Sequence, residues 1–139
     1  TAAREEASLD FYSMTGDVVC YMGDDRHFYL WDGRAIAYLA EDRVFAFDGR
    51  QLGWLDNGWL YDRGNRPSLF TVDAFGGPAR PLRKARPVRT QPQRKPAKAP
   101  RQLGLIKATR TFEWSPAAGP AYFEQEDPNF LGPGVFGAL

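Results

Sequence analysis

The chain has 139 residues, with 18 Lys and Arg, 17 Asp and Glu, one His and one Cys. This length allows one domain with appendages and excludes two full domains. A single cysteine excludes an intramolecular disulfide, and one His with one Cys excludes a zinc site of the usual four soft ligands. No run approaches the roughly 20 apolar residues of a membrane helix, and no secretory signal pattern appears. We therefore expect a cytoplasmic protein, or one on the cytoplasmic side of an assembly.

The net charge of +1 hides three segments of opposite sign. Residues 1–73 carry 7 basic and 13 acidic side chains, whereas residues 74–112 carry 11 basic side chains and no acidic one. Residues 113–139 carry four acidic side chains and no basic one. An acidic head, a basic arm and an acidic end are therefore predicted to be distinct in function.

The expected segments follow in chain order. Residues 1–8 form a short N-terminal segment that could make one helical turn, which is too short to be stable alone. Residues 9–74 contain four copies of one sequence motif, which is clearest in Trp31–Leu39 and Phe47–Leu55. Their anchoring glycines are spaced by 17, 16 and 15 residues, and these are Gly16, Gly33, Gly49 and Gly64. A fixed period predicts a fold that stacks one structural unit.

Each copy has a sequence pattern typical of a β-hairpin. An aromatic-rich run leads into an Asp-Gly or related turn, where glycine supplies a positive φ, and a second apolar run follows. A small residue stands four positions after each glycine and a large one comes next, which suggests close backbone approach with aromatic side chains packed around it. The sequence predicts an all-β fold of four hairpins in a pseudo-four-fold radial arrangement, like a flower or pinwheel. Pro67 predicts an edge position for the last strand.

Three phrases carry a resemblance to a known family: Tyr29–Arg34, Val44–Trp54 and Gly58–Asp62. Their repeated aromatic–Asp–Gly motif resembles that of the bacterial four-fold β-flower domain. The resemblance covers residues 9–74 and implies four hairpins arranged like petals, followed by a tail rich in Pro, Lys and Arg. The first copy departs from the pattern, with Thr15 in place of Asp and Asp17 in place of Arg. No established activity, and hence no functional residue, comes with the resemblance.

Residues 75–102 form an arm whose composition changes abruptly, with six prolines between residues 78 and 101. Such a segment cannot bury enough apolar surface to fold alone, so we expect it to be extended and held by a partner, a second copy or its own head. It is either a solvated spacer, an electrostatic contact for an acidic protein surface, or a contact for nucleic acid through phosphates. The candidate partner-binding cations are Arg80, Arg83, Lys84, Arg86, Arg89, Arg94, Lys95, Lys98 and Arg101.

Residues 103–139 form a hydrophobic C-terminal segment in which aromatic residues are separated by Pro and Gly. They cannot make an independent core, so two alternatives remain. The aromatic side chains dock into a partner as anchors, or they fold back onto the head. The candidate anchors are Phe112, Trp114, Tyr122, Phe123, Phe130 and Phe136.

No motif for catalysis, metal binding or a cofactor is found, so we expect neither an enzyme nor a cofactor. His27 is expected at the surface and Cys20 in the core. The aspartates beside the turns are expected to cap those turns. Their expected partners are Arg34 and Arg50, together with Arg26 and Arg43 in the links between the hairpins. The aromatic residues Trp31, Trp54 and Trp59, with Tyr21 and Tyr38, are expected to be buried in an aromatic core, with a carbohydrate or peptide platform as the alternative.

The sequence thus favours a non-enzymatic interaction protein, an accessory or stabilising subunit of a large assembly. The head would dock, the arm would cross an acidic surface, and the C-terminal aromatic residues would anchor. The alternatives are a nucleic-acid-associated protein that uses residues 78–101 and a carbohydrate- or peptide-binding module. Contact with a membrane would come only through the partner complex.

Overall fold

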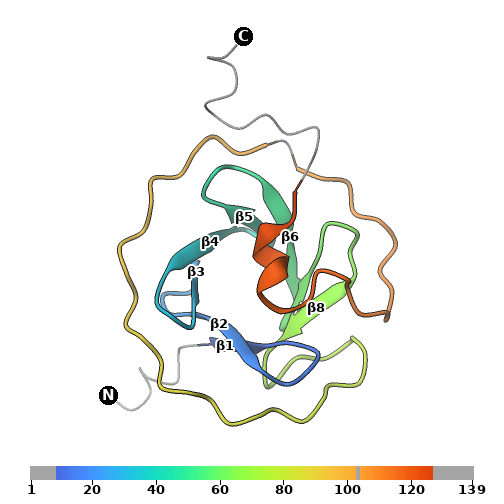
Figure 1. Ribbon diagram of the computed structural model, residues 1–139. Coiled ribbons are helices and arrows are strands. Elements are labelled where there is room, and N and C mark those ends of the chain that lie inside the picture. The colour runs from blue at the N-terminus through green and yellow to red at the C-terminus, as the bar shows by residue number, and fades with distance from the viewer. Residues whose placement is uncertain (1–8, 103, 127–139) are drawn as a thin grey trace.

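A computed structural model describes residues 9–102 and 104–126. Eight antiparallel strands close into a barrel in chain order (Figure 1). Their bounds are β1 Leu9–Tyr12, β2 Val18–Met22, β3 His27–Leu30, β4 Ala35–Ala40, β5 Arg43–Ala46, β6 Gln51–Asp56, β7 Trp59–Tyr61 and β8 Pro67–Phe70. The all-β fold of four hairpins about a common centre is therefore confirmed.

The barrel closes between its first and last strands, where Tyr12 of β1 pairs with Phe70 of β8. The expected edge position of the last strand is therefore wrong. Pro67 is the first residue of β8, where the missing N–H costs little, and its carbonyl accepts a hydrogen bond of 2.7 Å from the Ser115 amide. Closure pairs both edges of the sheet, which limits pairing with other chains.

The four hairpin turns share one geometry, but the fourth is displaced from its expected glycine. Gly16, Gly33 and Gly49 have φ values of 87°, 94° and 100°, and each amide bonds to the carbonyl three residues earlier. In the fourth turn Asn65 holds this position, with φ 64° and a bond from its amide to Asp62. Asn tolerates the left-handed region, so the step from Gly49 is 16 residues and Gly64 is not the equivalent.

Because Asn65 replaces Gly64 as the reference residue of the fourth turn, the predicted small residue four positions later and the large residue after it also shift by one position. Counted from Asn65, the fourth position is Leu69 and the fifth is Phe70, in place of Ser68 and Leu69. Cys20, Ala37 and Leu69 all belong to the central core of the barrel. The next residue in each strand points to the opposite face of the sheet, and these outward-facing residues are Tyr21, Tyr38, Trp54 and Phe70. Close backbone approach is found at Gly53, which faces Tyr61.

The prediction for the single cysteine is confirmed, whereas that for the single histidine is wrong. Cys20 is fully buried as expected, and burial raises the pKa of its thiol well above the ordinary value. His27 was expected at the surface, but it is buried at the start of β3. Its ring stacks on Phe47, and its Nδ1 lies 2.8 Å from the Asp24 carboxylate. The link before β3 therefore supplies a polar partner that allows the imidazole to be buried.

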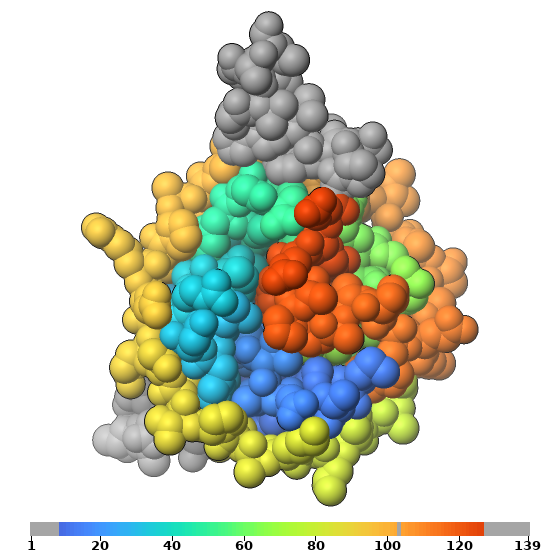
Figure 2. Space-filling view, viewed as in Figure 1, coloured from blue at the N-terminus to red at the C-terminus, as the bar shows by residue number. Residues whose placement is uncertain are grey.

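The rear half of the chain packs on the barrel rather than apart from it. The extended segment that we call the strap, residues 78–102 and 104–113, runs around the outside of the barrel (Figure 1). A 3₁₀ helix, η1 (Gly119–Glu124), then lies over the centre of the barrel (Figure 2). Tyr122 and Phe123 of η1 belong to the central core. The described parts of the segments expected at 75–102 and 103–139 therefore both contact the barrel formed by residues 9–74.

Candidate functional site

The strap follows the four-fold symmetry of the barrel with a period of nine residues. The amides of Lys84, Gln93 and Gln102 donate to the carbonyl oxygens of the turn glycines Gly16, Gly33 and Gly49, at 2.9, 2.8 and 2.9 Å. The strap passes so close to these turns that a Cβ at Gly33 would lie 2.3 Å from the Gln91 carbonyl oxygen. A Cβ at Gly16 would meet the Leu82 carbonyl oxygen in the same way, so close approach of the strap requires glycine at both of these turns.

The strap therefore divides into four units that begin at residues 78, 87, 96 and 105. The third residue of each unit is a cation: Arg80, Arg89, Lys98 and Lys107. Three of them lie over outward-facing rings of the even-numbered strands. Arg89 Cζ is 4.1 Å from the centre of the Tyr21 ring, and Lys98 Nζ is 4.7 Å from that of Tyr38. Lys107 Nζ is 5.6 Å from the centre of the Trp54 ring.

The sixth residue of each unit repeats this contact on the odd-numbered strands, except in the second unit, where it is Pro92. Arg110 Cζ lies 3.8 Å from the centre of the Tyr61 ring. The other two contacts are Arg83 with Tyr12 at 5.6 Å and Arg101 with Phe45 at 5.3 Å. A cation over an aromatic face is attracted by the ring quadrupole, so these pairs stabilise the strap on the barrel.

The sequence carried a signal for this arrangement that composition alone did not reveal. Pro78, Pro87 and Pro96 are nine residues apart, and so are the third-position cations. A nine-residue period beside a barrel period of 16 or 17 indicates a second layer with the same symmetry. The outward-facing rings then have a role, because they are the surface that the strap covers.

Part of the strap's charge is neutralised by the acidic barrel. Lys107 pairs with Asp42 at 3.4 Å and Arg110 with Asp56 at 2.8 Å. Lys84 lies 3.4 Å from Asp17, whose pKa is lowered first by a hydrogen bond from Thr15 and then by Lys84. Two further pairs join Arg86 and Arg89 to Asp10, and the first of them raises the pKa of Arg86. Opposite charges on head and arm therefore meet within one chain.

The remaining strap cations have no such partner. Within residues 9–102 and 104–126, no carboxylate oxygen lies within 4.0 Å of six of the nine candidate cations. These six are Arg80, Arg83, Arg94, Lys95, Lys98 and Arg101. All six are exposed. Their positive charge is thus available to solvent or to a ligand.

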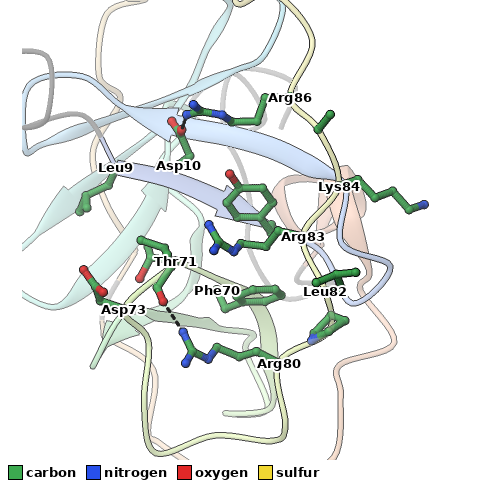
Figure 3. Close-up of a pocket in the computed structure, with 14 residues that line it drawn as sticks. Leu9, Asp10, Phe70, Thr71, Asp73, Arg80, Leu82, Arg83, Lys84 and Arg86 are labelled. Carbon is green, nitrogen blue, oxygen red and sulfur yellow. Dashed lines mark hydrogen bonds and ion pairs between the residues drawn. The ribbon is translucent and has the colours of Figure 1, made fainter.

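One cavity, of about 1190 Å³, lies where the strap leaves β8 and passes β1 (Figure 3). Arg80 donates to the Val72 carbonyl at its edge, and Arg83 reaches into it from the strap. The cavity also contains the carboxylates of Asp10 and Asp73. Its electrostatic character is therefore mixed.

A second cavity, of about 570 Å³, lies between β4 and the third unit of the strap. Three cations line it, Arg26, Lys98 and Arg101, together with Tyr38. No carboxylate is among its lining residues in the part of the chain that the structure describes. This cavity therefore has a positive character without internal compensation.

The predicted aromatic anchors divide into three groups. Trp114, Tyr122 and Phe123 pack against the barrel, and the Tyr122 hydroxyl donates to the Tyr61 carbonyl at 2.8 Å. For these three the fold-back alternative describes the structure. Phe112 is 67 % exposed and so remains available to a partner. Phe130 and Phe136 lie outside the described residues.

The turn aspartates cap their turns as expected. Asp32 and Asp48 accept from the amides of Arg34 and Arg50 and pair with the side chains of those arginines. Asp62 accepts from the Gly64 and Arg66 amides and from the Ser115 hydroxyl, the last at 2.5 Å. These carboxylates are therefore held by structural bonds. The expected pairing of Arg26 and Arg43 with carboxylates is wrong, because neither side chain forms an ion pair or hydrogen bond with another described residue.

The rings considered for a ligand platform are covered. Trp54 and Trp59 are fully buried, and the indole N–H of Trp31 donates to the Pro87 carbonyl of the strap at 3.0 Å. Burial of Trp54 and Trp59 is thus confirmed, although the strap rather than the barrel interior covers Trp54. Across residues 9–102 and 104–126 we find no cluster of three metal-ligating side chains, and no helix long and apolar enough to cross a bilayer.

These features define the class of protein: a closed barrel of four hairpins, encircled by its own basic strap and capped by a short helix. The chain belongs to a family described as 4-fold beta flower protein, whose profile matches residues 9–123. The match runs beyond residue 74 and includes the strap and η1. No curated protein and no solved structure matches the chain.

Proposed function

We propose that this protein is a non-enzymatic interaction protein, an accessory or stabilising subunit of a larger assembly, and that its strap contacts an acidic surface of a partner protein. The observation that carries the proposal is the set of six exposed strap cations without a carboxylate partner among the described residues. A complementary acidic surface would be steered toward these cations and would gain register from them.

The strap is suited to this role because the barrel holds it in place before any partner binds. Backbone hydrogen bonds at Lys84, Gln93 and Gln102 fix it at three turns. A preordered segment loses less conformational entropy on binding than a free one. The exposed side chains of Leu82 and Val88 stand between the cations and could add apolar contacts at the same surface.

The proposal differs from the sequence-based expectation in its anchors. Three of the expected anchors pack against the barrel and are not available to a partner: Trp114, Tyr122 and Phe123. The proposed surface therefore uses the strap cations together with Phe112.

The test compares the wild-type chain with a variant in which Arg80, Arg83, Lys98 and Arg101 are changed to Gln. Cross-linking in cells of the source organism, followed by mass spectrometry, should join the wild-type strap to defined acidic segments of one partner. The variant should lose those cross-links while keeping its circular dichroism spectrum. A wild-type chain that remains monomeric and uncross-linked would contradict the proposal.

A nucleic-acid-associated protein is the second candidate, supported by the same uncompensated cations. Its contact would be mainly with phosphates, because the outward-facing rings of the barrel lie beneath the strap. Random duplex DNA should then bind with an affinity that falls steeply as salt rises, and the same variant should abolish binding. DNA binding without protein cross-links would favour this candidate over the first.

A further inference from the structure

We propose that the cavity lined by Arg26, Lys98 and Arg101 binds a phosphate group, either as the free ion or as a monoester. These three cations come from different segments: Arg26 precedes β3, and the other two belong to the third strap unit. The wall between them is formed by Tyr38 and Leu39 of β4 and by Pro100 of the strap. The cavity is thus a positive recess of about 570 Å³ with no acidic wall among the described residues.

The three cations lack the counter-charge that their neighbours have. Lys98 and Arg101 contact the faces of Tyr38 and Phe45, which leaves their hydrogen-bond donors without a carboxylate acceptor. The side chain of Arg26 makes no hydrogen bond or ion pair with any other described residue. In the next strap unit the equivalent third-position cation, Lys107, pairs with Asp42. The third unit therefore holds charge that the barrel does not neutralise.

The geometry favours a phosphate over a single carboxylate. A phosphate offers several acceptor oxygens, and guanidinium groups bind them in a bidentate manner, whereas lysine contributes a point charge. Two guanidinium groups and one ammonium group around one recess exceed what one carboxylate can satisfy. The Tyr38 phenol adds a fourth polar group to the wall.

The site is also formed in advance. The Ala99 amide donates to Phe47 at 2.8 Å, and the Gln102 amide donates to Gly49 at 2.9 Å. These bonds fix the strap backbone beside Lys98 and beside Arg101. The cation contacts with Tyr38 and Phe45 further restrict the two side chains. Little ordering is then needed when the anion binds.

The experiment is a titration of the full chain with inorganic phosphate at constant ionic strength, followed by ¹⁵N NMR. The amide signals of Leu39, Ala40 and Ala99 should shift with a dissociation constant on the order of 1 mM, a weak affinity typical of a small ion. Arg26→Gln should weaken binding at least fivefold. It should not disturb the fold, because the Arg26 side chain is exposed and forms no hydrogen bond or ion pair with another described residue.

Arg94→Gln is the matched control, because it also removes one exposed strap cation but lies outside the cavity lining. It should weaken phosphate binding less than twofold. Equal weakening by both variants would show a diffuse charge effect and overturn the site, as would the absence of saturable shifts in the wild-type chain.

Glycerol 3-phosphate, titrated in parallel, distinguishes the two sources of the group. Tighter binding of the ester would assign the site to esterified phosphate, and equal or weaker binding would assign it to the free ion. The inference does not rest on the proposed protein partner. Changing Arg80 and Arg83 to Gln should weaken partner contact while leaving phosphate binding within twofold of the wild type.

Discussion

Gly53 in β6 faces the backbone of Tyr61 in β7 so closely that a Cβ on Gly53 would lie 1.7 Å from the Tyr61 carbonyl oxygen. The same Cβ would lie 2.8 Å from the Tyr122 hydroxyl, which donates to that carbonyl. The φ of Gly53 is 153°, a conformation that residues with a side chain rarely adopt. One glycine therefore permits both the barrel wall and the attachment of η1.

Gly53→Ala should consequently cost more than about 3 kcal/mol of unfolding free energy, because backbone rather than a flexible side chain must move. Urea denaturation followed by tryptophan fluorescence measures this loss. Gly23→Ala is the control, since its Cβ would meet only the Tyr21 ring at an ordinary 3.6 Å. A Gly53→Ala variant as stable as the control would show that β6 and β7 are not held this closely.

The cap formed by η1 should contribute to stability through one buried hydroxyl. Tyr122 is fully buried, and burial raises the pKa of its phenol well above the ordinary value. Tyr122→Phe keeps the ring but leaves the Tyr61 carbonyl without its donor, so it should cost about 1–2 kcal/mol. Thermal denaturation should detect this loss. Phe112→Ala, which removes an exposed ring at the end of the strap, should change stability by less than about 0.5 kcal/mol.

The contact between Arg110 and Tyr61 should be measurable as an energetic coupling. The guanidinium lies 3.8 Å from the ring centre and also binds Asp56 at 2.8 Å. A double-mutant cycle of Arg110→Ala with Tyr61→Leu should give a coupling of about 0.5–2 kcal/mol. The cycle of Arg94→Ala with Tyr61→Leu should give none, because the exposed Arg94 side chain forms no hydrogen bond, ion pair or ring contact with another described residue. Equal couplings in both cycles would contradict a specific role for the strap pairs.

The strap should show one preferred site for trypsin. The bonds after Arg83, Arg89, Lys98 and Arg101 each precede an amide that donates to the barrel. Such bonds resist cleavage, because a protease must first detach the segment that it binds. The bonds after Lys84, Lys107 and Arg110 precede amides without such a bond, but the side chains of these residues pair with Asp17, Asp42 and Asp56 and are therefore held away from the protease. At Arg94 neither the side chain nor the following amide, that of Lys95, has such a partner among the described residues. Cleavage of the isolated protein should therefore occur first after Arg94, and the two fragments should elute together under native conditions. Simultaneous cleavage along the whole strap would show that it is not held by the barrel.

The front half of the fold was predictable because its signal is local. Asp-Gly turns and alternating apolar residues specify hairpins without reference to the rest of the chain. The prediction for the fourth turn was wrong because it placed Gly64 at the position of positive φ. Asn65, the next residue, can also adopt a positive φ and holds this position in the structure. Pro67 was assigned to an edge for a sound local reason, but the closure of β8 against β1 is a property of the whole barrel.

Amino-acid composition could not predict where the strap lies on the barrel. Proline and cations predicted an extended segment correctly, but its position depends on contacts across more than 40 residues, such as Arg110 with Tyr61. Tyr21 and Tyr38 were expected in an aromatic centre because a single strand does not show which of its two faces will be covered. Only the matching periods of nine and about sixteen residues connect the two layers, and their connection becomes evident once the barrel is built.

The link before β3 should make stability sensitive to acid. Partial burial raises the pKa of Asp24, but hydrogen bonds from the His27 backbone, the His27 ring and the Arg26 amide outweigh it, so the folded-state pKa lies below 3.8. A depressed carboxyl pKa stabilises the folded state above the unfolded-state pKa, and this contribution is lost as the pH falls through the folded-state value. Asp24→Asn should therefore lower the unfolding free energy at pH 6, and the difference from the wild type should shrink below about pH 4. Asp25→Asn, which removes an adjacent carboxylate without a hydrogen-bond partner among the described residues, should show little difference at either pH. Chemical denaturation at several pH values measures both variants, and a constant difference for Asp24→Asn across that range would rule out the ionised carboxylate as the source of the stability.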